Sequence, residues 1–179
     1  THKMMIKNCL VLTNESLTAK QLDQYKKLPV QSAVLPFCRK LDENAFELFR
    51  TLRFVYAPCL EIIGERAFKD CSSLLTIFGD QIREINSNSM KQTVNLKFVT
   101  FENVETVKEN VFSNNCNIRS FVSSQVDSLP DCFSSCYNLC EVVVLNATTV
   151  YEIGQQQIKS VVCPLCPESQ VEKEKLNYC

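Results

Sequence analysis

Apolar residues recur at a nearly fixed interval along most of the chain, and this period is the main structural signal in the sequence. Counting from one apolar anchor per repeat, successive anchors lie 24, 22, 22, 22, 22 and 24 residues apart. The anchors are Leu17, Leu41, Ile63, Ile85, Val107, Leu129 and Ile153. The positions 11, 8, 6 and 3 residues before each anchor are apolar in 25 of 28 cases, where the chain-wide fraction of 45% gives roughly 13. A period of this length predicts a repeat protein.

The spacing inside each repeat predicts one short strand and one turn. Three of the apolar positions read L-x-x-L-x-L, and their last residues alternate as the two faces of a strand do. One such unit cannot bury its own apolar row, whereas stacked units form a common core. We therefore expect parallel strands near residues 9–12, 31–36, 53–58, 75–80, 97–102, 119–124 and 140–145.

The other face of each repeat is predicted to hold short α or 3-10 segments. Thr18 and Gln21 form a capping-box pattern, which predicts a helix that continues to about Leu28, before Pro29. The fold class is then α/β: a solenoid of about seven coils, with a parallel sheet on one face and short helical segments on the other. We expect the solenoid to span residues 1–162 and a C-terminal cap or tail to span 163–179.

One repeat carries a specific motif. The segment from Ile63 to Leu74 fits the pattern I-G-x-x-A-F-x-x-C-x-x-L and resembles the BspA-type leucine-rich repeat, found in bacterial surface antigens and in proteins of anaerobic protists. Other repeats keep parts of it, such as Ala45-Phe46 and Ile153-Gly154. The resemblance implies an adhesive or scaffolding role without a defined activity, because a fold alone does not supply a function.

Composition and charge exclude several classes of function. The 19 basic and 20 acidic residues nearly balance, so we expect no nucleic-acid partner, and no apolar run approaches the roughly 18 residues that cross a bilayer. Three scattered glycines do not make a phosphate-binding loop, and the single histidine, His2, lies too near a chain end for a catalytic triad. We therefore expect a non-enzymatic protein with no cofactor.

The positions of the eleven cysteines within the repeat separate expected structural roles from chemical ones. Cys9, Cys38, Cys71 and Cys136 fall on core positions or on the cysteine of the motif, so we expect them to be small buried residues. Unpaired core cysteines favour a reducing compartment and hence the cytoplasm. The family resemblance instead permits the cell surface or secretion.

A sharper cysteine motif, Cys163-Pro-Leu-Cys166, lies near the C-terminus. It fits a cap loop with free thiols or a disulfide. It also fits half of a zinc site completed by another chain or by missing sequence, since structural zinc needs four ligands and only Cys179 follows the motif. Redox chemistry is a third reading. The alternative function is accordingly a zinc- or disulfide-linked assembly unit, and an enzyme with a reactive cysteine is the remaining one.

The strand face is the predicted contact surface for a protein partner. Residues between the core positions point outward, and aromatic side chains among them form a cluster across adjacent strands. The candidate binding residues are Phe54, Tyr56, Phe78, Phe98, Thr100, Glu102, Val122 and Val143. Two other readings remain: a terminal tail covers this face, or the aromatic residues only stabilise neighbouring strands. The leading hypothesis is a protein-binding or scaffolding module that uses this face.

Overall fold

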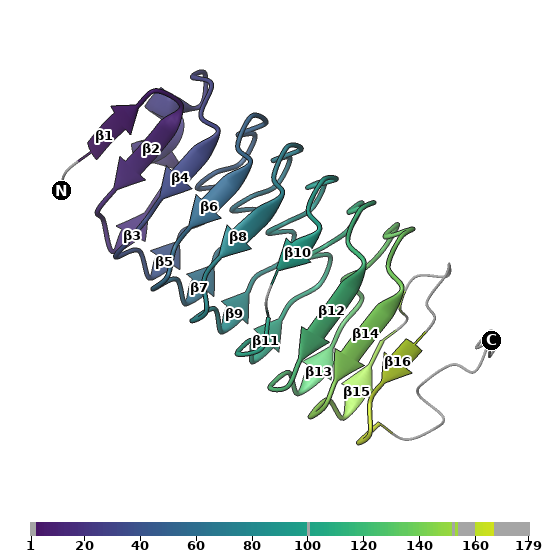
Figure 1. The fold of residues 1–179 in the computed structure, drawn as a ribbon. Coiled ribbons are helices and arrows are strands. Elements are labelled where there is room, and N and C mark those ends of the chain that lie inside the picture. Colours follow the sequence, from purple (N-terminus) through teal and green to yellow (C-terminus); the bar gives the residue numbers. More distant parts are fainter. Residues whose placement is uncertain (1–2, 100, 152, 154–159, 167–179) are drawn as a thin grey trace.

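The chain folds into a β-solenoid of about seven turns, seen in a computed structural model that describes residues 3–99, 101–151, 153 and 160–166. Lys3, Phe98 and Val99 are described by their backbone alone. Each coil contributes one strand to the main strand face, so that strands distant in sequence lie side by side (Figure 1). These strands are β2 (Cys9–Leu12), β4 (Ser32–Val34), β6 (Phe54–Tyr56), β8 (Thr76–Phe78), β10 (Phe98–Val99), β12 (Ser120–Ser123), β14 (Glu141–Val144) and β16 (Ser160–Val162).

All seven predicted strands are present, and β16 adds an eighth. A second row of two-residue strands, which the sequence did not predict, follows the bend in each coil (Figure 1). These strands are β3 (Ser16–Leu17), β5 (Lys40–Leu41), β7 (Ile62–Ile63), β9 (Glu84–Ile85), β11 (Thr106–Val107), β13 (Ser128–Leu129) and β15 (Thr149–Val150). The predicted anchors from Leu17 to Leu129 lie here, since Leu17 pairs with Leu41, Leu41 with Ile63 and Ile63 with Ile85.

The N-terminal end of the solenoid is closed by a hairpin and a short helix. Strand β1 (Lys3–Ile6) pairs antiparallel with β2 through the two-residue turn Lys7-Asn8. The predicted capping box is present, because the Thr18 side chain accepts from the Gln21 amide while the Gln21 side chain accepts from the Thr18 amide. The helix is shorter than predicted: α1 (Ala19–Leu22) continues as the 3-10 turn η1 (Asp23–Tyr25).

Later coils replace the predicted helical segments with consecutive turns. In four successive coils, two residues four positions apart adopt positive φ, as Asn44 and Leu48 do at 57° and 67°. The amides of Asn44, Phe46 and Leu48 donate to Glu65 O, Ala67 O and Lys69 O of the next coil, while those of Ala45 and Glu47 bond within their own coil. A helix directs every amide to its own coil. Turns instead let alternate amides join neighbouring coils, and this ladder repeats to Asn114.

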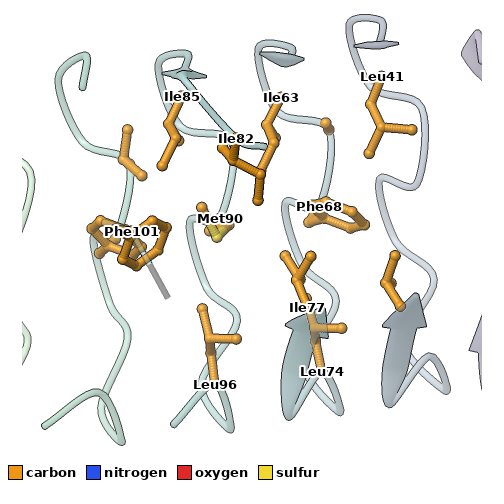
Figure 2. Close-up of a cluster of buried hydrophobic side chains, with 14 of the residues drawn as sticks. Leu41, Ile63, Phe68, Leu74, Ile77, Ile82, Ile85, Met90, Leu96 and Phe101 are labelled. Atoms are coloured by element: carbon orange, nitrogen blue, oxygen red, sulfur yellow. The ribbon is translucent and has the colours of Figure 1, made fainter. Parts of the chain in front are cut away.

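The core is a set of apolar files that run along the solenoid axis. Leu52, Leu74 and Leu96 are fully buried at equivalent places in successive coils, and Leu41, Ile63 and Ile85 form a second file (Figure 2). A third file holds large side chains, including the stacked rings of Phe46 and Phe68. The stacking is close at Gly64, where a Cβ would lie within 3.0 Å of backbone atoms of Leu41 and Asp42.

The repeat pattern predicted the first coil with a register error of one residue. Leu10 and Leu12 are buried, whereas Cys9 and Val11 are partly exposed and Ile6 is exposed, so the core position assigned to Cys9 was wrong. The pairing of Leu10 with Ala33 shows the shift. Its cause is a bend after β2 that is one residue shorter than in later coils, which moves every strand residue to the opposite face.

The last coil was also misplaced. Val150, not Ile153, pairs with Leu129, so this coil has 21 residues rather than 24. Its buried strand residues are Val142 and Val144, and Leu145, assigned to the core by the period, is exposed.

A seam divides the strand face between the fifth and sixth coils. Strands β1, β2, β4, β6, β8 and β10 form one sheet and β12, β14 and β16 another, with no ladder between β10 and β12 among the described residues. Side chains bridge the gap, since Ser123 Oγ donates to Val104 O at 3.0 Å and Ser124 Oγ to Glu102 O at 3.1 Å. Behind it, the rings of Phe101, Phe112, Phe121 and Phe133 pack with centroids 5.3–5.9 Å apart.

Candidate functional site

The larger sheet carries two parallel rows of outward side chains. Strand register aligns Met4, Val11, Val34, Tyr56 and Phe78 in the first row. The second row aligns Ile6, Cys9, Ser32, Phe54, Thr76 and, by its backbone, Phe98. We call these two rows together the apolar face. They lie across β1, β2, β4, β6, β8 and β10 of Figure 1.

The aromatic members of the apolar face are among its most exposed residues. Relative exposure is 53% for Phe78, 51% for Tyr56 and 40% for Phe54. Their strand neighbours Val55 and Ile77 are buried, because alternate residues of a strand point to opposite sides. The Arg53 guanidinium lies 5.6 Å from the centre of the Phe54 ring, so this cation lies over an aromatic member of the face.

Opposite charges border the apolar face at the two ends of its strands. Arg53 and Lys97 precede β6 and β10 and are exposed, and Arg119 holds the equivalent exposed place before β12 of the smaller sheet. Asp80 and Glu102 follow their strands and are also exposed. None of these five residues forms an ion pair with another residue in the described part of the chain. One border is therefore basic and the other acidic, and both are open to a charged partner.

The smaller sheet presents a different surface. Its register aligns Val122, Val143 and Val162 in an aliphatic row. The adjacent row holds Ser120, Glu141 and Ser160, so half of this surface is polar. No outward residue of its paired strands is aromatic, which distinguishes it from the apolar face.

The candidate binding residues fall on both sheets. Phe54, Tyr56, Phe78, Glu102 and Val122 are exposed and Val143 is half-buried. Phe98 lies in register with Thr76, while its side chain and the whole of Thr100 lie outside the described residues.

The sequence analysis missed the N-terminal part of the apolar face. Met4 and Ile6 are each 53% exposed and belong to the hairpin strand β1, which was not predicted. A signal was present, because two short apolar runs flank Lys7-Asn8, and asparagine favours two-residue hairpin turns.

Four cysteine thiols are buried in the core and are not nucleophiles. Burial raises the pKa of the Cys38 thiol to about 11 and that of Cys136 to about 12, and it raises the pKa values of Cys71 and Cys132 as well. Cys71 Sγ donates to Phe46 O and Cys136 Sγ to Phe112 O, both at 3.0 Å. The hydrogen bonds of Cys71 and Cys136 thus join adjacent coils. A raised pKa keeps all four thiols protonated, whereas a reactive cysteine needs a thiolate.

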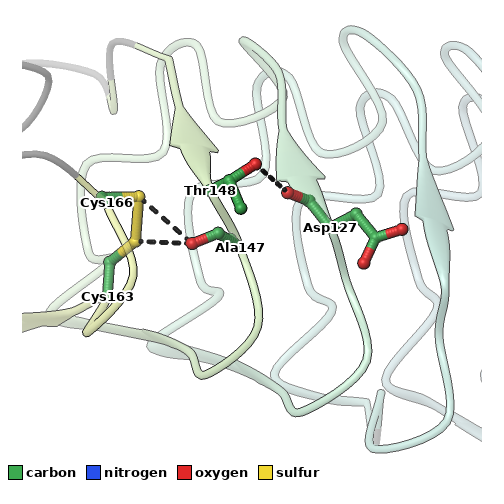
Figure 3. The surroundings of a disulfide bond; sticks show 5 residues. All are labelled: Asp127, Ala147, Thr148, Cys163 and Cys166. Atoms are coloured by element: carbon green, nitrogen blue, oxygen red, sulfur yellow. Dashed lines mark hydrogen bonds between the residues drawn. A yellow bond between two sulfur atoms is a disulfide. The ribbon is translucent and has the colours of Figure 1, made fainter.

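The C-terminal motif is oxidised, with Cys163 and Cys166 joined to each other (Figure 3). Their sulfurs lie 3.3 and 3.4 Å from Ala147 O, against the last complete coil. Neither sulfur is then a thiolate that could bind zinc or link a second chain. Cys179 lies outside the described residues, within which no group of three or more potential ligands could hold a metal ion.

A shallow hollow of about 490 Å³ lies between the η1 turn and the second coil. It is lined by Lys26, Lys27, Leu28, Pro29, Leu48, Arg50 and Thr51. Its three cations are surface side chains, and no buried polar group faces the hollow from the described residues, so it does not define a ligand. No helix in the described part of the chain is long and apolar enough to span a membrane.

Fold and surface together define a leucine-rich-repeat solenoid with an exposed strand face. The sequence profile of the BspA type Leucine rich repeat region matches residues 61–163 in six copies. Because this match covers more than half of the chain, the protein belongs to the BspA-type leucine-rich-repeat family.

Comparison with solved structures shows the same fold. The chain is similar to the crystal structure of a T. pallidum leucine-rich-repeat protein, with a TM-score of 0.56 and 18% identity, covering 99% of this chain and 93% of that chain. It is also similar to a leucine-rich cell surface protein of Faecalibacterium prausnitzii A2-165, with a TM-score of 0.56 and 16% identity, covering 86% of this chain and 53% of that chain. Among curated proteins no significant match was found.

Proposed function

We propose that this protein is a non-enzymatic binding module that holds a protein partner against the apolar face. The observation that carries the proposal is the alignment of Tyr56 and Phe78 beside Phe54 at 40–53% exposure in a continuous sheet. Contiguous exposed apolar surface on a soluble protein marks an interaction site. Aromatic residues and arginine dominate binding energy at interfaces, and Arg53 supplies a cation at the edge.

The rigidity of the strand face supports the same function. Its strands are paired on both sides from β2 to β8, so the outward side chains are held in fixed register before a partner arrives. A preformed surface loses little conformational entropy on binding. The partner that suits it is a flat protein surface with an apolar centre and charges of both signs at its edges.

The cell surface, rather than the cytoplasm, is the proposed location. The cytoplasmic expectation rested on unpaired core cysteines, and the comparisons do not support it. Cys71 and Cys136 form no disulfide because each thiol is buried and donates to a carbonyl of the preceding coil. Their unpaired state therefore does not depend on the cellular compartment. The Cys163–Cys166 disulfide is a feature of oxidising environments. The F. prausnitzii protein of similar fold is described as a cell surface protein.

Capture of partners from a surface extract of the source cell tests the proposal. The purified chain is immobilised and compared with a Tyr56→Ser/Phe78→Ser variant, which we expect to lose the captured proteins. Tyr137→Ser is the matched control, because Tyr137 is 53% exposed, like Phe78, but lies in a turn before β14. Equal capture by all three proteins would refute binding through the apolar face.

A further inference from the structure

We infer that the apolar face binds a second copy of this chain, face to face, with the two-fold axis parallel to the solenoid axis. This inference rests on the proposed function and names the partner of the same surface. Two sheets that pack face to face lie about 10 Å apart and interdigitate their outward side chains. The apolar face is suited to this packing because its two rows run straight across six aligned strands.

The distribution of charge selects the symmetry. Lys97 precedes β10 and Glu102 follows it, so the two charges lie at opposite ends of this strand. A two-fold axis parallel to the solenoid axis reverses the strand direction while keeping each coil opposite itself. Lys97 of one copy then faces Glu102 of the other, and Glu102 faces Lys97, so that the contact is made twice.

Neighbouring coils carry the same signs of charge at the two borders. Arg53 lies on the basic border with Lys97, and Asp80 lies on the acidic border with Glu102. In the same orientation the basic border of one copy lies along the acidic border of the other. None of these four residues has an ion-pair partner among the described residues.

The other face-to-face symmetry is disfavoured. A two-fold axis parallel to the strands keeps their direction, so the basic border of one copy meets the basic border of the other, and the two acidic borders also meet. Like charges brought together at an interface oppose association.

The contact is of modest size, so the dimer is expected to dissociate on dilution. Six strands spaced about 4.8 Å apart give a patch about 25 Å long and two side chains wide. This lies at the lower end of specific protein interfaces. Association is therefore measured over a range of concentrations by sedimentation velocity at low and at physiological salt.

Charge reversal tests the geometry without touching the core, since Lys97 and Glu102 are both exposed. Lys97→Glu alone and Glu102→Lys alone each place like charges opposite one another twice, and we expect dimerisation about tenfold weaker or more. An equimolar mixture of the two variants places opposite charges together at both contacts, so we expect the mixed dimer to form at wild-type strength. Circular dichroism of each variant confirms that it is folded.

Three results would overturn the inference. A wild-type chain that remains monomeric at every concentration excludes the dimer, and capture of another protein through Tyr56 and Phe78 would then leave the proposed function intact. A dimer that the single charge variants and Tyr56→Ser/Phe78→Ser do not weaken would place the contact elsewhere. A dimer weakened by Tyr56→Ser/Phe78→Ser but not by charge reversal would exclude the proposed symmetry.

Discussion

The two sheets of the strand face share one inner architecture and differ on the outside. Inward positions are filled by Val55 and Ile77 in the larger sheet and by Phe121 and Val142 in the smaller one, all nearly or fully buried. Outward positions in the larger sheet include Phe54, Tyr56 and Phe78, whereas in the smaller one they are serine, glutamate and valine. The inner side is constrained by stacking of the coils. The outer side is free to vary, and there the two sheets present different surfaces.

The largest expected effect comes from weakening the seam between the two sheets. In Phe121→Ala the ring that contacts Phe101, Phe112 and Phe133 is lost, and the cavity is expected to cost about 3–5 kcal/mol of unfolding free energy. Because no strand ladder joins β10 to β12 in the described residues, we also expect urea unfolding, followed by circular dichroism, to split into two transitions.

Phe68→Ala is the control for this prediction. Phe68 is equally buried but stacks on Phe46 within the larger sheet's own coils. We expect a similar loss of stability with a single transition. A split transition in Phe68→Ala, or none in Phe121→Ala, would mean that the seam does not separate two folding units.

An effect of about 2 kcal/mol is expected from removing the disulfide, as the short loop it closes implies. In Cys163→Ala/Cys166→Ala the loss is confined to the smaller sheet, because β16 pairs with β14 alone. Amide hydrogen exchange is expected to accelerate in β14 and β16 and to stay unchanged in β4 and β6. Acceleration in all four strands would show that the two sheets unfold as one unit.

The buried thiols are expected to make both regions less stable at alkaline pH. Burial raises the pKa of Cys38 from 9.0 to about 11 and that of Cys136 to about 12, so the unfolded chain releases these protons first. The contribution of each protonated thiol to folding stability is complete below about pH 9. It is lost as the pH rises toward 11 for Cys38 and toward 12 for Cys136. Each thiol accounts for about 1 kcal/mol between pH 9 and 10.

Urea midpoints measured at pH 8, 9 and 10 check this dependence. Cys38→Ala and Cys136→Ala should each give a flatter decline than the wild type, one for each region. Cys59→Ala is the control, because Cys59 is only partly buried. A wild-type decline that neither core variant reduces would contradict the assignment to these thiols.

The repeat pattern predicted the strands and the core because both follow from local alternation and a fixed period. It failed where one residue changes the length of a coil. The short bend after Leu12 and the 21-residue spacing from Leu129 to Val150 shift the register, and neither shift changes the apolar composition. The convex turns were missed for another reason: Asn44 and Leu48 adopt positive φ to reach the next coil, a bond between distant residues that no local pattern contains.

The candidate site was predictable in its centre and not at its edge. Phe54, Tyr56 and Phe78 lie in regular coils, so their outward direction followed from alternation alone. Met4 and Ile6 join the same rows only through the antiparallel pairing of β1 with β2, which reverses the chain outside the repeat. The repeat pattern predicts only the parallel pairs, so it could not place the two residues that the antiparallel pair adds to the surface.

The smallest effect on stability is expected at the surface that differs most between the sheets. Phe78→Ser and Val143→Ser should each change the unfolding free energy by less than about 1 kcal/mol, since outward residues contribute little to folding. Their effects on association should diverge: Phe78→Ser weakens binding because Phe78 lies in the aromatic row, whereas Val143→Ser leaves it unchanged. Thermal unfolding and sedimentation of the same samples separate the two quantities. A cooperative unfolding transition lost in Phe78→Ser would mean that this ring supports the fold, and equal association of both variants would remove the functional distinction between the two sheets.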